Sequence, residues 1–517
     1  MEYENDVKEI TIVGGGIIGV CVAYYLVNHP SFDKTKYHIT VFESNSVACA
    51  ASGKAGGLLA SFAFPSQLGS LSFAMHKELA AKYDGEKNWD YRGLETISME
   101  ADVSSERLEK MEESKRRKAK GQGKPRKSKQ PTGTTYGTGV VTGGPTAKMS
   151  LKGMLGADPS ENSVNSPNHA DSDNESDGME YNSDGEESIY STVDMSDTEA
   201  DRDAVVALPK NLNWIEEELV DDWSTLGTLE TTAQLHPYKF TNFILQKAME
   251  SGAVDLIYGR VSEVRLNEET GEAVGFRYVP NMNKNEGKKL PGTKIGKVSE
   301  VVTPATATKY SFSDKDGDVY EVLNVDRIVI ALGPWTSLVL STCPVTALRA
   351  HSMTVQPESS EEITAYAIFT ELRINDSDYF SPEIYARKDE VYLCGEGDSV
   401  AYLPDPTIPI PYDKAKCEEL FNYAKKLSKN LNNGYIKKMQ ACYLPVVNAA
   451  TTSGPLVGET NVPHLFIASG HSCWGINNAP ITGKLLAEIM LEGEARSAQI
   501  DKLNPTLYFD ARQSIKS

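Results

Sequence analysis

The sequence predicts an α/β fold of two domains, and three separated glycine-containing segments carry that prediction. The first runs from Ile10 to Glu43, and the second is an apolar strand over 326–334 that ends on small residues. The third, over 465–493, has the pattern of a strand, a glycine-rich turn and a helix. Strands that feed directly into helices are typical of layered α/β domains. At 517 residues the chain is also too long for one small core.

The first segment has the residue order of a dinucleotide-binding turn. An apolar run leads into GGGIIG at 14–19, then a helical stretch, then a second strand-like run that closes on Glu43. Gly14 allows the tight turn, Gly16 lets the backbone approach a pyrophosphate, and Gly19 lets the helix pack against the sheet. The unpaired N–H groups at the helix start favour phosphate. Glu43, 24 residues after Gly19, is placed to accept hydrogen bonds from an adenosine ribose.

Two other interpretations of this stretch are weaker. The 18 residues from Ile10 to Val27 carry no charge, which is near the minimum for a membrane span. Glycines interrupt that run, however, and the nine residues before it, MEYENDVKE, are acidic. A secretory signal requires a basic start, so that interpretation is disfavoured too. We expect a dinucleotide cofactor and no transmembrane segment.

Charge is distributed unevenly along the chain. The formal net charge is −20, yet residues 107–129 hold 11 Lys and Arg against 3 acidic residues. Residues 158–203 hold 15 acidic residues against one Arg. Few apolar residues and blocks of like charge do not offset the entropy of ordering, so we expect a disordered basic-then-acidic insertion over 101–203.

The insertion suggests partners, whereas the rest of the chain excludes one class of them. Ser172, Ser176 and Ser183 have acidic residues just downstream, as an acidophilic kinase requires, and the same tract equally fits a solvated spacer. Protein partners are therefore expected through the insertion. The acidic remainder argues against nucleic-acid binding.

The cysteines indicate a reducing compartment. There are seven, they are scattered, and no CxxC pair occurs. A disulfide framework and a zinc site both fit this pattern poorly, and isolated thiols fit better. The C-terminus does not end in a peroxisomal Ser-Lys-Leu signal. A cytoplasmic location and no metal site are expected.

The predicted elements alternate between the two domains. Residues 236–264 have the pattern of an amphipathic helix, a glycine stop and a strand, and 341–450 alternates strands with one helix. The expected division, in order, is 8–75 cofactor domain, 76–100 substrate domain, 101–203 insertion, 204–235 substrate domain, 236–340 cofactor domain with a flexible loop at 280–308, 341–450 substrate domain, 451–495 cofactor domain and 496–517 tail.

Several motifs in one order make the chain resemble a known superfamily. ASGKAGG at 51–57 follows the first motif, DRIVIALGPW lies at 326–335, and IASGH at 467–471 precedes GINNAP at 475–480. This order resembles the D-amino-acid-oxidase-like (DAO) superfamily of FAD-dependent oxidoreductases, which includes glycine oxidase and sarcosine oxidase. The nearest likeness is to a fungal branch of FAD oxidoreductases, the topoisomerase-I-damage-affected type. The resemblance implies a Rossmann-like FAD domain of the GR2 type with an interleaved mixed-sheet substrate domain.

The resemblance also implies which residues contact FAD. A helix starting near Ala479 would point its positive end at the flavin N1–C2=O edge, where reduction places negative charge. By position, the implied contacts are Gly14, Gly16, Ile17, Ile18 and Gly19 at the pyrophosphate, Glu43 and Ser44 at the adenosine ribose, Ser52 and Gly53 beside the phosphates and flavin, Val261 at the adenine, Gly333 over the cofactor, and Gly470, His471, Gly475 and Ile476 around the isoalloxazine ring.

The substrate side departs from the family pattern. Amino-acid oxidases of the superfamily have a Gly-Leu-Arg-Pro segment whose arginine binds the substrate carboxylate, and ACYLP at 441–445 places Leu444 there. Leucine offers no guanidinium for bidentate binding. Arg387 is an alternative anchor, although a surface position fits it better. The pocket candidates are His351, Tyr385, Tyr443, His471 and Trp474.

Two of these candidates and two thiols have competing interpretations. His471 suits either proton transfer or the bracing of a tight turn, and the second is favoured. Cys49 and Cys473 are possible flavin attachment points, but buried thiols fit both better. No catalytic base follows from the sequence.

The expected function is oxidation of an amine-like C–N bond, or a similarly activated C–H bond, by hydride transfer to flavin N5. The substrate is an unidentified small molecule. The alternative is a flavin-binding regulatory protein with reduced catalysis, acting at endosomal membranes. A nicotinamide-dependent dehydrogenase fits the segment up to Glu43 but not the Gly470–Pro480 turn.

Overall fold

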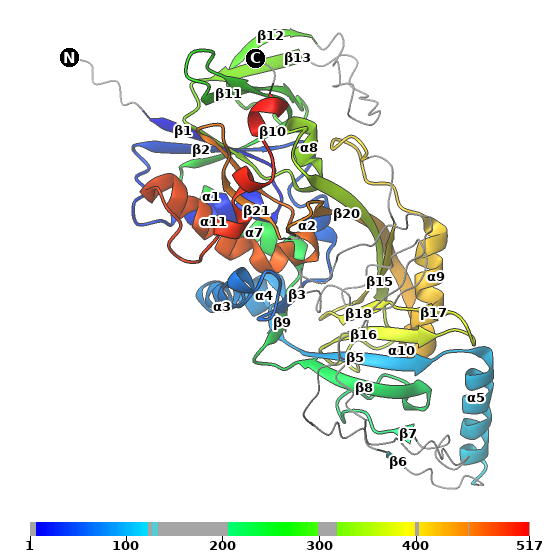
Figure 1. Ribbon diagram of the computed structural model, residues 1–517. Coiled ribbons are helices and arrows are strands. Elements are labelled where there is room, and N and C mark those ends of the chain that lie inside the picture. Colours follow the sequence, from blue (N-terminus) through cyan, green and yellow to red (C-terminus); the bar gives the residue numbers. More distant parts are fainter. Residues whose placement is uncertain are drawn as a thin grey trace, which may run out of the picture.

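Two domains, each built on a large β-sheet, make up the described part of the chain (Figure 1). In this computed structural model the described residues are 7–121, 128–129, 131, 205–297, 318–398, 403–452 and 454–515. Most of the predicted insertion, with Ser172, Ser176 and Ser183, lies outside these residues.

Nine strands of the described chain form the sheet of the first domain. Its five central strands are parallel neighbours, in the order β10 (Val254–Leu266), β2 (Tyr37–Glu43), β1 (Lys8–Val13), β14 (Arg327–Ile330) and β22 (Leu465–Ser469). Their buried Ile and Val residues match the apolar runs in the sequence. Antiparallel strands complete both sides: β11 (Ala273–Pro280), β13 (Asp318–Leu323), β12 (Thr293–Lys297) and β21 (Leu456–Glu459).

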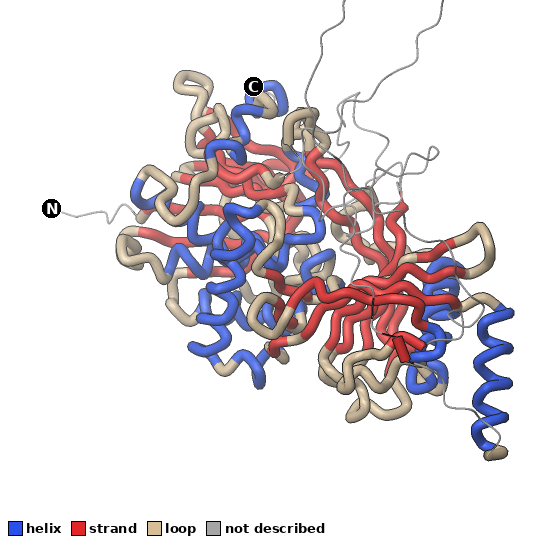
Figure 2. Tube along the Cα trace, turned by 60° about the horizontal axis from the view of Figure 1, so that its bottom comes forward, coloured by secondary structure: helices blue, strands red, loops and turns tan. Residues whose placement is uncertain are grey.

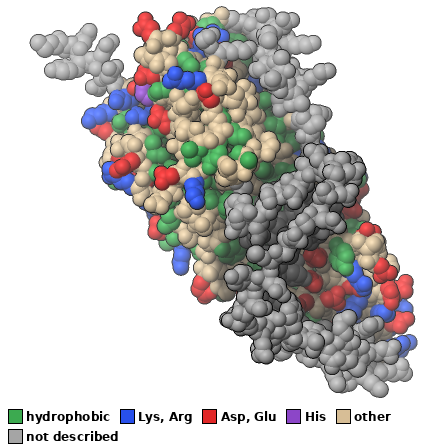
Figure 3. All heavy atoms as spheres, in the orientation of Figure 1, with side chains coloured by type: hydrophobic (Ala, Val, Ile, Leu, Met, Phe, Trp, Pro, Cys, Tyr) green, Lys and Arg blue, Asp and Glu red, His purple; other side chains and the backbone are tan. Residues whose placement is uncertain are grey.

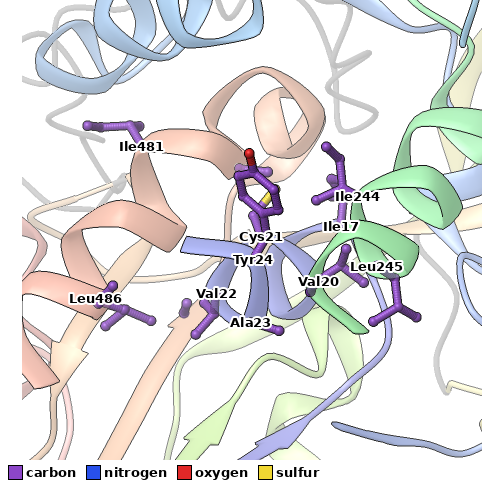
Figure 4. Packing of buried hydrophobic residues seen from close by; sticks show 14 of the residues in the cluster. Ile17, Val20, Cys21, Val22, Ala23, Tyr24, Ile244, Leu245, Ile481 and Leu486 are labelled. Carbon is purple, nitrogen blue, oxygen red and sulfur yellow. The ribbon is translucent and has the colours of Figure 1, made fainter. Parts of the chain in front are cut away.

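The helix that follows the glycine turn is the centre of this domain. Helix α1 (Ile17–Val27) packs between α7 (Pro237–Met249) and α11 (Gly475–Glu492), as Figure 4 shows. A Cβ added to Gly483 of α11 would lie 2.6 Å from the backbone of Cys21, so the two helices approach as closely as glycine permits. Helix α11 in turn packs on α3 (Ser66–Tyr83), which is followed by α4 (Gly85–Trp89).

The second domain is a mixed sheet of eight strands among the described residues, with helices on one face (Figure 2). The buried faces of α9 (Lys414–Ala424) and α10 (Lys429–Asn432) join the core of this sheet. The strand order is β20 (Tyr435–Val447), β15 (Val345–Gln356), β19 (Val391–Asp398), β18 (Glu383–Ala386), β16 (Tyr366–Arg373), β5 (Glu95–Asp102) and β8 (Val220–Gly227), with β17 (Tyr379–Phe380) beside β16.

Short elements connect the two domains. Strand β3 (Leu58–Ala60) pairs with β9 (Thr232–Gln234), which also pairs with β4 (Arg92–Gly93). The four-residue helices α2 (Ala51–Lys54) and α8 (Thr336–Val339) lie where the domains meet, because each contacts elements of both.

Two expected boundaries are wrong. The first domain was expected to end at residue 75, but α3 continues to Tyr83 and packs on α11, so the chain crosses over only near β5. The helix expected near Ala479 begins at Gly475.

Regular structure occurs in the three segments expected to be an insertion, a loop and a tail. Helix α5 (Ser105–Ala119) occupies the start of the predicted insertion: Ser104 caps it and buried Met111 anchors it. Strand β12 lies inside the loop expected at 280–308. The tail forms short 3₁₀ helices and buries Ala511 and Ile515.

Acidic and basic side chains are mixed over the face seen in Figure 3. No described helix combines the length and apolar character needed to cross a membrane.

Candidate functional site

A cavity of about 660 Å³ lies between the two domains. One wall comes from the β1–α1 turn, the end of β2 and residues 331–339, at the carboxyl edge of the parallel strands. The other wall is a face of the second sheet, from β15, β18, β19 and β20. The turn 471–476, residues 259–264 of β10 and the tail residues Ser514 and Ile515 also line it.

The glycine turn shapes the first wall through its backbone. Gly14 has φ of +122°, and a Cβ added there would lie 2.3 Å from the carbonyl oxygen of Ala331. The N–H of Ile17, at the start of α1, donates to the hydroxyl of Ser52 at 2.9 Å. Because α1 carries no acidic residue in its first turn, this end is suited to a negatively charged ligand.

Glu43 is held rigidly at the end of β2. Its Oε2 accepts from the N–H of Gly15 at 2.9 Å, and its Oε1 accepts from the N–H of Asn45 at 2.8 Å. Burial raises the pKa of Glu43, and both N–H donors oppose that shift. The carboxylate therefore has a fixed position beside the glycine turn.

A segment of the substrate domain lies across the same end of the cavity. Asp405 forms a buried ion pair with Arg260 of β10, with 2.6 Å between Nη1 and Oδ2. Trp335 donates its indole N–H to the carbonyl of Pro404 at 2.9 Å, and Asn45 donates to the carbonyl of Thr407 at 3.0 Å. Pro406 lines the cavity. We call residues 403–410 the strap.

The strap was not predicted from the sequence. Its contacts join positions more than 60 residues apart, such as Trp335 and Pro404, and no local pattern marks them. The same holds for Ser514 and Ile515, whose packing places the expected tail against the cavity.

His471 has the contacts of a residue that braces its turn. It is buried, its Nε2 lies 3.1 Å from the hydroxyl of Thr482, and burial lowers its pKa to about 3. Burial thus favours the neutral imidazole, which supports the bracing interpretation over proton transfer. Gly470, with φ of +87°, permits the turn into α11.

A comparison with models of protein families shows the family of this chain. The model of the family described as FAD dependent oxidoreductase (DAO) matches residues 9–139 and 194–489. The chain belongs to this family.

Relatives and solved structures agree with that assignment. A Saccharomyces cerevisiae protein named "Putative oxidoreductase TDA3" is 46% identical over 514 residues, covering 98% of this chain and 95% of the relative. Glycine oxidase from Geobacillus kaustophilus has a TM-score of 0.55 at 14% identity, covering 97% of this chain and 99% of its own. L-proline dehydrogenase from P. horikoshii has a TM-score of 0.55 at 15% identity, covering 99% of this chain and 100% of its own. The predicted family and fold are confirmed.

The first wall fits the cofactor of the family. A Cβ on Gly14 would lie 2.3 Å from the Ala331 carbonyl oxygen and one on Gly16 would lie 3.1 Å from the Ser52 hydroxyl, so both glycines let the turn pack closely where its backbone lines the cavity. Glu43 supplies a fixed acceptor for ribose hydroxyls. Of the residues expected to contact FAD, those lining the cavity are Gly14, Gly16, Ile17, Ile18, Glu43, Ser44, Ser52, Val261, Gly333, His471, Gly475 and Ile476.

The remaining three expected residues support the backbone and do not line the cavity. A Cβ on Gly19 would lie 2.1 Å from the carbonyl of Gly14, and one on Gly53 would lie 2.1 Å from that of Ala48. Gly470 has its role in the turn described above. The sequence therefore indicated glycines that the fold requires, but these three were expected to contact FAD directly.

The substrate-side candidates separate into two groups. Tyr385 and Trp474 line the cavity. His351 and Tyr443 do not: His351 accepts from the N–H of Asp413 at 2.9 Å, and the Tyr443 ring packs against Trp335. Consecutive side chains of a strand point to opposite faces of its sheet. Leu444 faces the cavity, so the adjacent Tyr443 points away from it.

Arg387 is buried, so the expectation of a surface position is wrong. Its guanidinium donates to the carbonyls of Ala55 and Gly56, pairs with Glu390 at 3.0 Å and lies over the ring of Tyr392. These contacts fix the loop after α2 and leave Arg387 outside the cavity lining. It is a positioning residue, and not the alternative carboxylate anchor.

Burial disfavours the thiolate form of both cysteines considered for flavin attachment. Cys49 and Cys473 both line the cavity. Burial raises the pKa of Cys49, and it raises the pKa of Cys473 to about 12. A thiol rather than a thiolate is a poor nucleophile, which favours non-covalent binding.

Proposed function

We propose that the protein binds FAD non-covalently in this cavity and oxidises the C–N bond of an amine-like substrate. One observation carries the proposal: a single cavity joins the glycine turn and Glu43 to an open face of the substrate sheet. In that arrangement a dinucleotide and a small molecule occupy the two ends. Glycine oxidase and L-proline dehydrogenase share this fold, and by their names they act on amino acids, which contain a C–N bond of this kind.

The chemistry divides between cofactor and protein. Bound flavin supplies a two-electron acceptor at N5. An ammonium substrate would release one proton from its nitrogen to solvent, and the carbon next to nitrogen would then give up its hydrogen as a hydride, so that a C=N bond forms. Dioxygen or another two-electron acceptor would serve as the final oxidant.

The protein positions the reactants and stabilises charge. The N-terminus of α11, at Gly475 and Ile476, lines the cavity and carries partial positive charge. Such a fixed dipole stabilises negative charge that develops on a bound group. Leu444 and its strand neighbour Leu348 exclude water from the substrate end.

Anaerobic flavin reduction tests the proposal. The purified protein, supplied with FAD, is mixed with a panel of amines and amino acids while absorbance near 450 nm is followed. We expect at least one compound to bleach the flavin, and air to restore the absorbance. A protein that binds no flavin, or whose flavin no compound on a broad panel bleaches, contradicts the proposal.

A further inference from the structure

The strap connects the two domains, yet its residues belong to no helix or strand. It follows β19 in the chain and precedes α9. Its two ends, Leu403 and Ile410, are buried in one apolar cluster with Trp335 of the first domain and Tyr443 of the second. Burial of both ends in one cluster holds the strap at the boundary between the domains, as a loop whose middle part crosses the cofactor wall.

The middle of the strap contacts the loop that follows Glu43. The hydroxyl of Ser44 lies 3.3 Å from the carbonyl oxygen of Pro406, and the side-chain amide of Asn45 donates to the carbonyl of Thr407 at 3.0 Å. Glu43 is the residue placed to bind an adenosine ribose. The same loop therefore holds the strap beside the position expected for that ribose.

Two further contacts join the strap to other segments at this end of the cavity. The ion pair of Asp405 with Arg260 reaches β10 one residue before Val261, the position implied for adenine. The indole N–H of Trp335 donates to the carbonyl of Pro404. Contacts from three separate segments of the first domain thus meet on the four consecutive residues 404–407.

The strap separates this end of the cavity from the outside. Pro406 lines the cavity, whereas Ile408 is 44% exposed and Pro409 is exposed as well. A wall that passes from cavity lining to exposed surface within two residues is one chain thick. An adenosine bound at this end would lie behind it.

The strap can detach without unfolding either domain. Side chains of the first domain make the four contacts, and no backbone–backbone hydrogen bond joins residues 403–410 to another part of the described chain. A segment held in this way opens locally while the sheets around it stay folded. Opening and closing of such loops controls how ligands enter and leave many enzymes.

We propose that the strap is a gate for the cofactor: it closes over the adenosine portion of bound FAD, and FAD enters and leaves only while the strap is detached. The inference rests on the proposed function for FAD binding at this site and on nothing about the substrate. A gate has a kinetic signature, because detachment is required in both directions. Loosening a gate accelerates both binding and release, whereas loosening a simple contact accelerates release alone.

Thr407→Val loosens the strap without changing the cavity lining. The Thr407 hydroxyl donates to Oδ1 of Asp405 at 2.6 Å, and Thr407 is not among the residues that line the cavity. Valine keeps the shape and loses the donor that helps to orient Asp405 toward Arg260. We expect the association and release rate constants of FAD each to rise roughly threefold to tenfold, as the loss of one hydrogen bond predicts, and Kd to change less than either.

Asp405→Asn is the stronger variant. It keeps the size of the side chain and removes its charge, so the contact with Arg260 weakens. Both rate constants should rise by about tenfold or more. The release rate should rise further than the association rate, because Pro406 beside it lines the cavity.

Thr35→Val is the matched control. Thr35 makes the same two contacts with Asp33, from its N–H at 2.9 Å and from its hydroxyl at 2.7 Å, at an exposed turn outside the cavity lining. It should change neither rate constant. Release is measured on the FAD-loaded protein by exchange with excess radiolabelled FAD, and association by stopped-flow mixing of FAD with the full chain freed of flavin.

The outcomes separate a gate from a contact and from the proposed reaction. Faster release with an unchanged association rate in both strap variants would show that the strap only holds the cofactor. Parental values of both rates would show that FAD takes another route, and either result overturns the inference. A parent protein that exchanges FAD through the gate but oxidises no amine removes the proposed reaction and leaves the gate, whereas a parent that binds no FAD overturns both.

Discussion

The two walls of the cavity are built by different means. The backbone gives the cofactor wall its shape at the glycine turn. Gly14 adopts φ of +122°, and the carbonyl oxygen of Ala331, which lies beside it, leaves no space for a Cβ. The substrate wall is a set of side chains on a regular sheet face, where Leu348, Leu444 and Glu383 stand on ordinary strand positions. Backbone shape restricts the residue types at a position, whereas a sheet face accepts many.

This difference explains what varies between the two ends. A substitution in the glycine turn changes the path of the chain, so it damages the fold and the cofactor site together. A substitution at Leu444 changes only which chemical group faces the ligand. A cofactor site that resembles its family can therefore coexist with a substrate site that does not.

The largest effect is expected from Gly14→Ala. The new Cβ would lie 2.3 Å from the Ala331 carbonyl oxygen, at a φ that L-residues rarely adopt. Strain and overpacking together should lower the free energy of unfolding by about 4 kcal/mol. The ratio of flavin to protein after purification should fall to near zero, and urea unfolding gives the stability.

Gly252→Ala is the matched control. Gly252 also has positive φ, +74°, but an added Cβ meets nothing within 4 Å. It should lose about 1 kcal/mol and keep its flavin. Equal losses in the two variants would show that backbone strain, and not the closeness of Ala331, sets the effect.

A smaller effect is expected when the strap loses its ion pair. Asp405→Ala removes the carboxylate that pairs with the buried Arg260 guanidinium, and breaking a buried pair costs about 3 kcal/mol. FAD affinity should fall as well, because Pro406 next to Asp405 lines the cavity. Urea unfolding and FAD titration measure the two losses.

Two comparisons sharpen that result. The double variant Arg260→Met with Asp405→Leu should regain most of the stability, since an apolar pair replaces two buried charges. Glu418→Ala removes an exposed ion pair with Lys414 and should cost less than about 1 kcal/mol. A loss from Asp405→Ala no larger than that of Glu418→Ala would mean that the strap contributes little.

The contrast between the walls also separates what the sequence could predict from what it could not. Gly14, Gly16 and Glu43 were found because a turn, a close approach and a strand end constrain residues near one another in the chain. The strap, Ser514 and Ile515 were not found, since their places depend on packing between distant segments. Helix α5 was missed because charge composition outweighed its Ser104 cap and its i to i+4 pair of Glu106 with Lys110.

Side-chain direction was the other limit. Tyr443 and Leu444 are adjacent in sequence, and only the register of β20 against β15 decides which of them faces the ligand. Arg387 was expected at the surface because arginine usually lies there, yet its partners, the carbonyls of Ala55 and Gly56, are more than 300 residues away.

The bracing of the cofactor wall by His471 predicts a pH effect of intermediate size. Burial lowers the folded-state pKa of His471 to about 3, whereas the unfolded value is near 6.5. Below pH 6.5 the unfolded chain binds a proton that the folded protein does not, so stability is lost as pH falls. Between pH 7.5 and 5 this group alone should account for about 2 kcal/mol.

The variant His471→Gln isolates that contribution. Its amide can still pair with the Thr482 hydroxyl but does not titrate. Urea unfolding at pH 7.5 and pH 5 should show a loss about 2 kcal/mol smaller in the variant than in the parent. The same slope in both proteins would show that His471 is protonated in the folded state, against the burial argument.

The smallest expected effect is on ligand choice, and it tests whether the substrate wall can change independently of the cofactor wall. Leu444→Arg places a guanidinium on the cavity face opposite Leu348, without altering the backbone of β20. A carboxylate then gains a partner, and we expect the Kd of glycine to fall about tenfold, equal to about 1.4 kcal/mol.

Leu444→Gln, polar but uncharged, controls for lost packing and should leave glycine binding unchanged. FAD affinity should stay within twofold of the parent in both variants, because the glycine turn and Glu43 lie on the opposite wall. A parallel loss of FAD would mean that the two walls are coupled, and that a departure at position 444 affects the cofactor as well as the substrate.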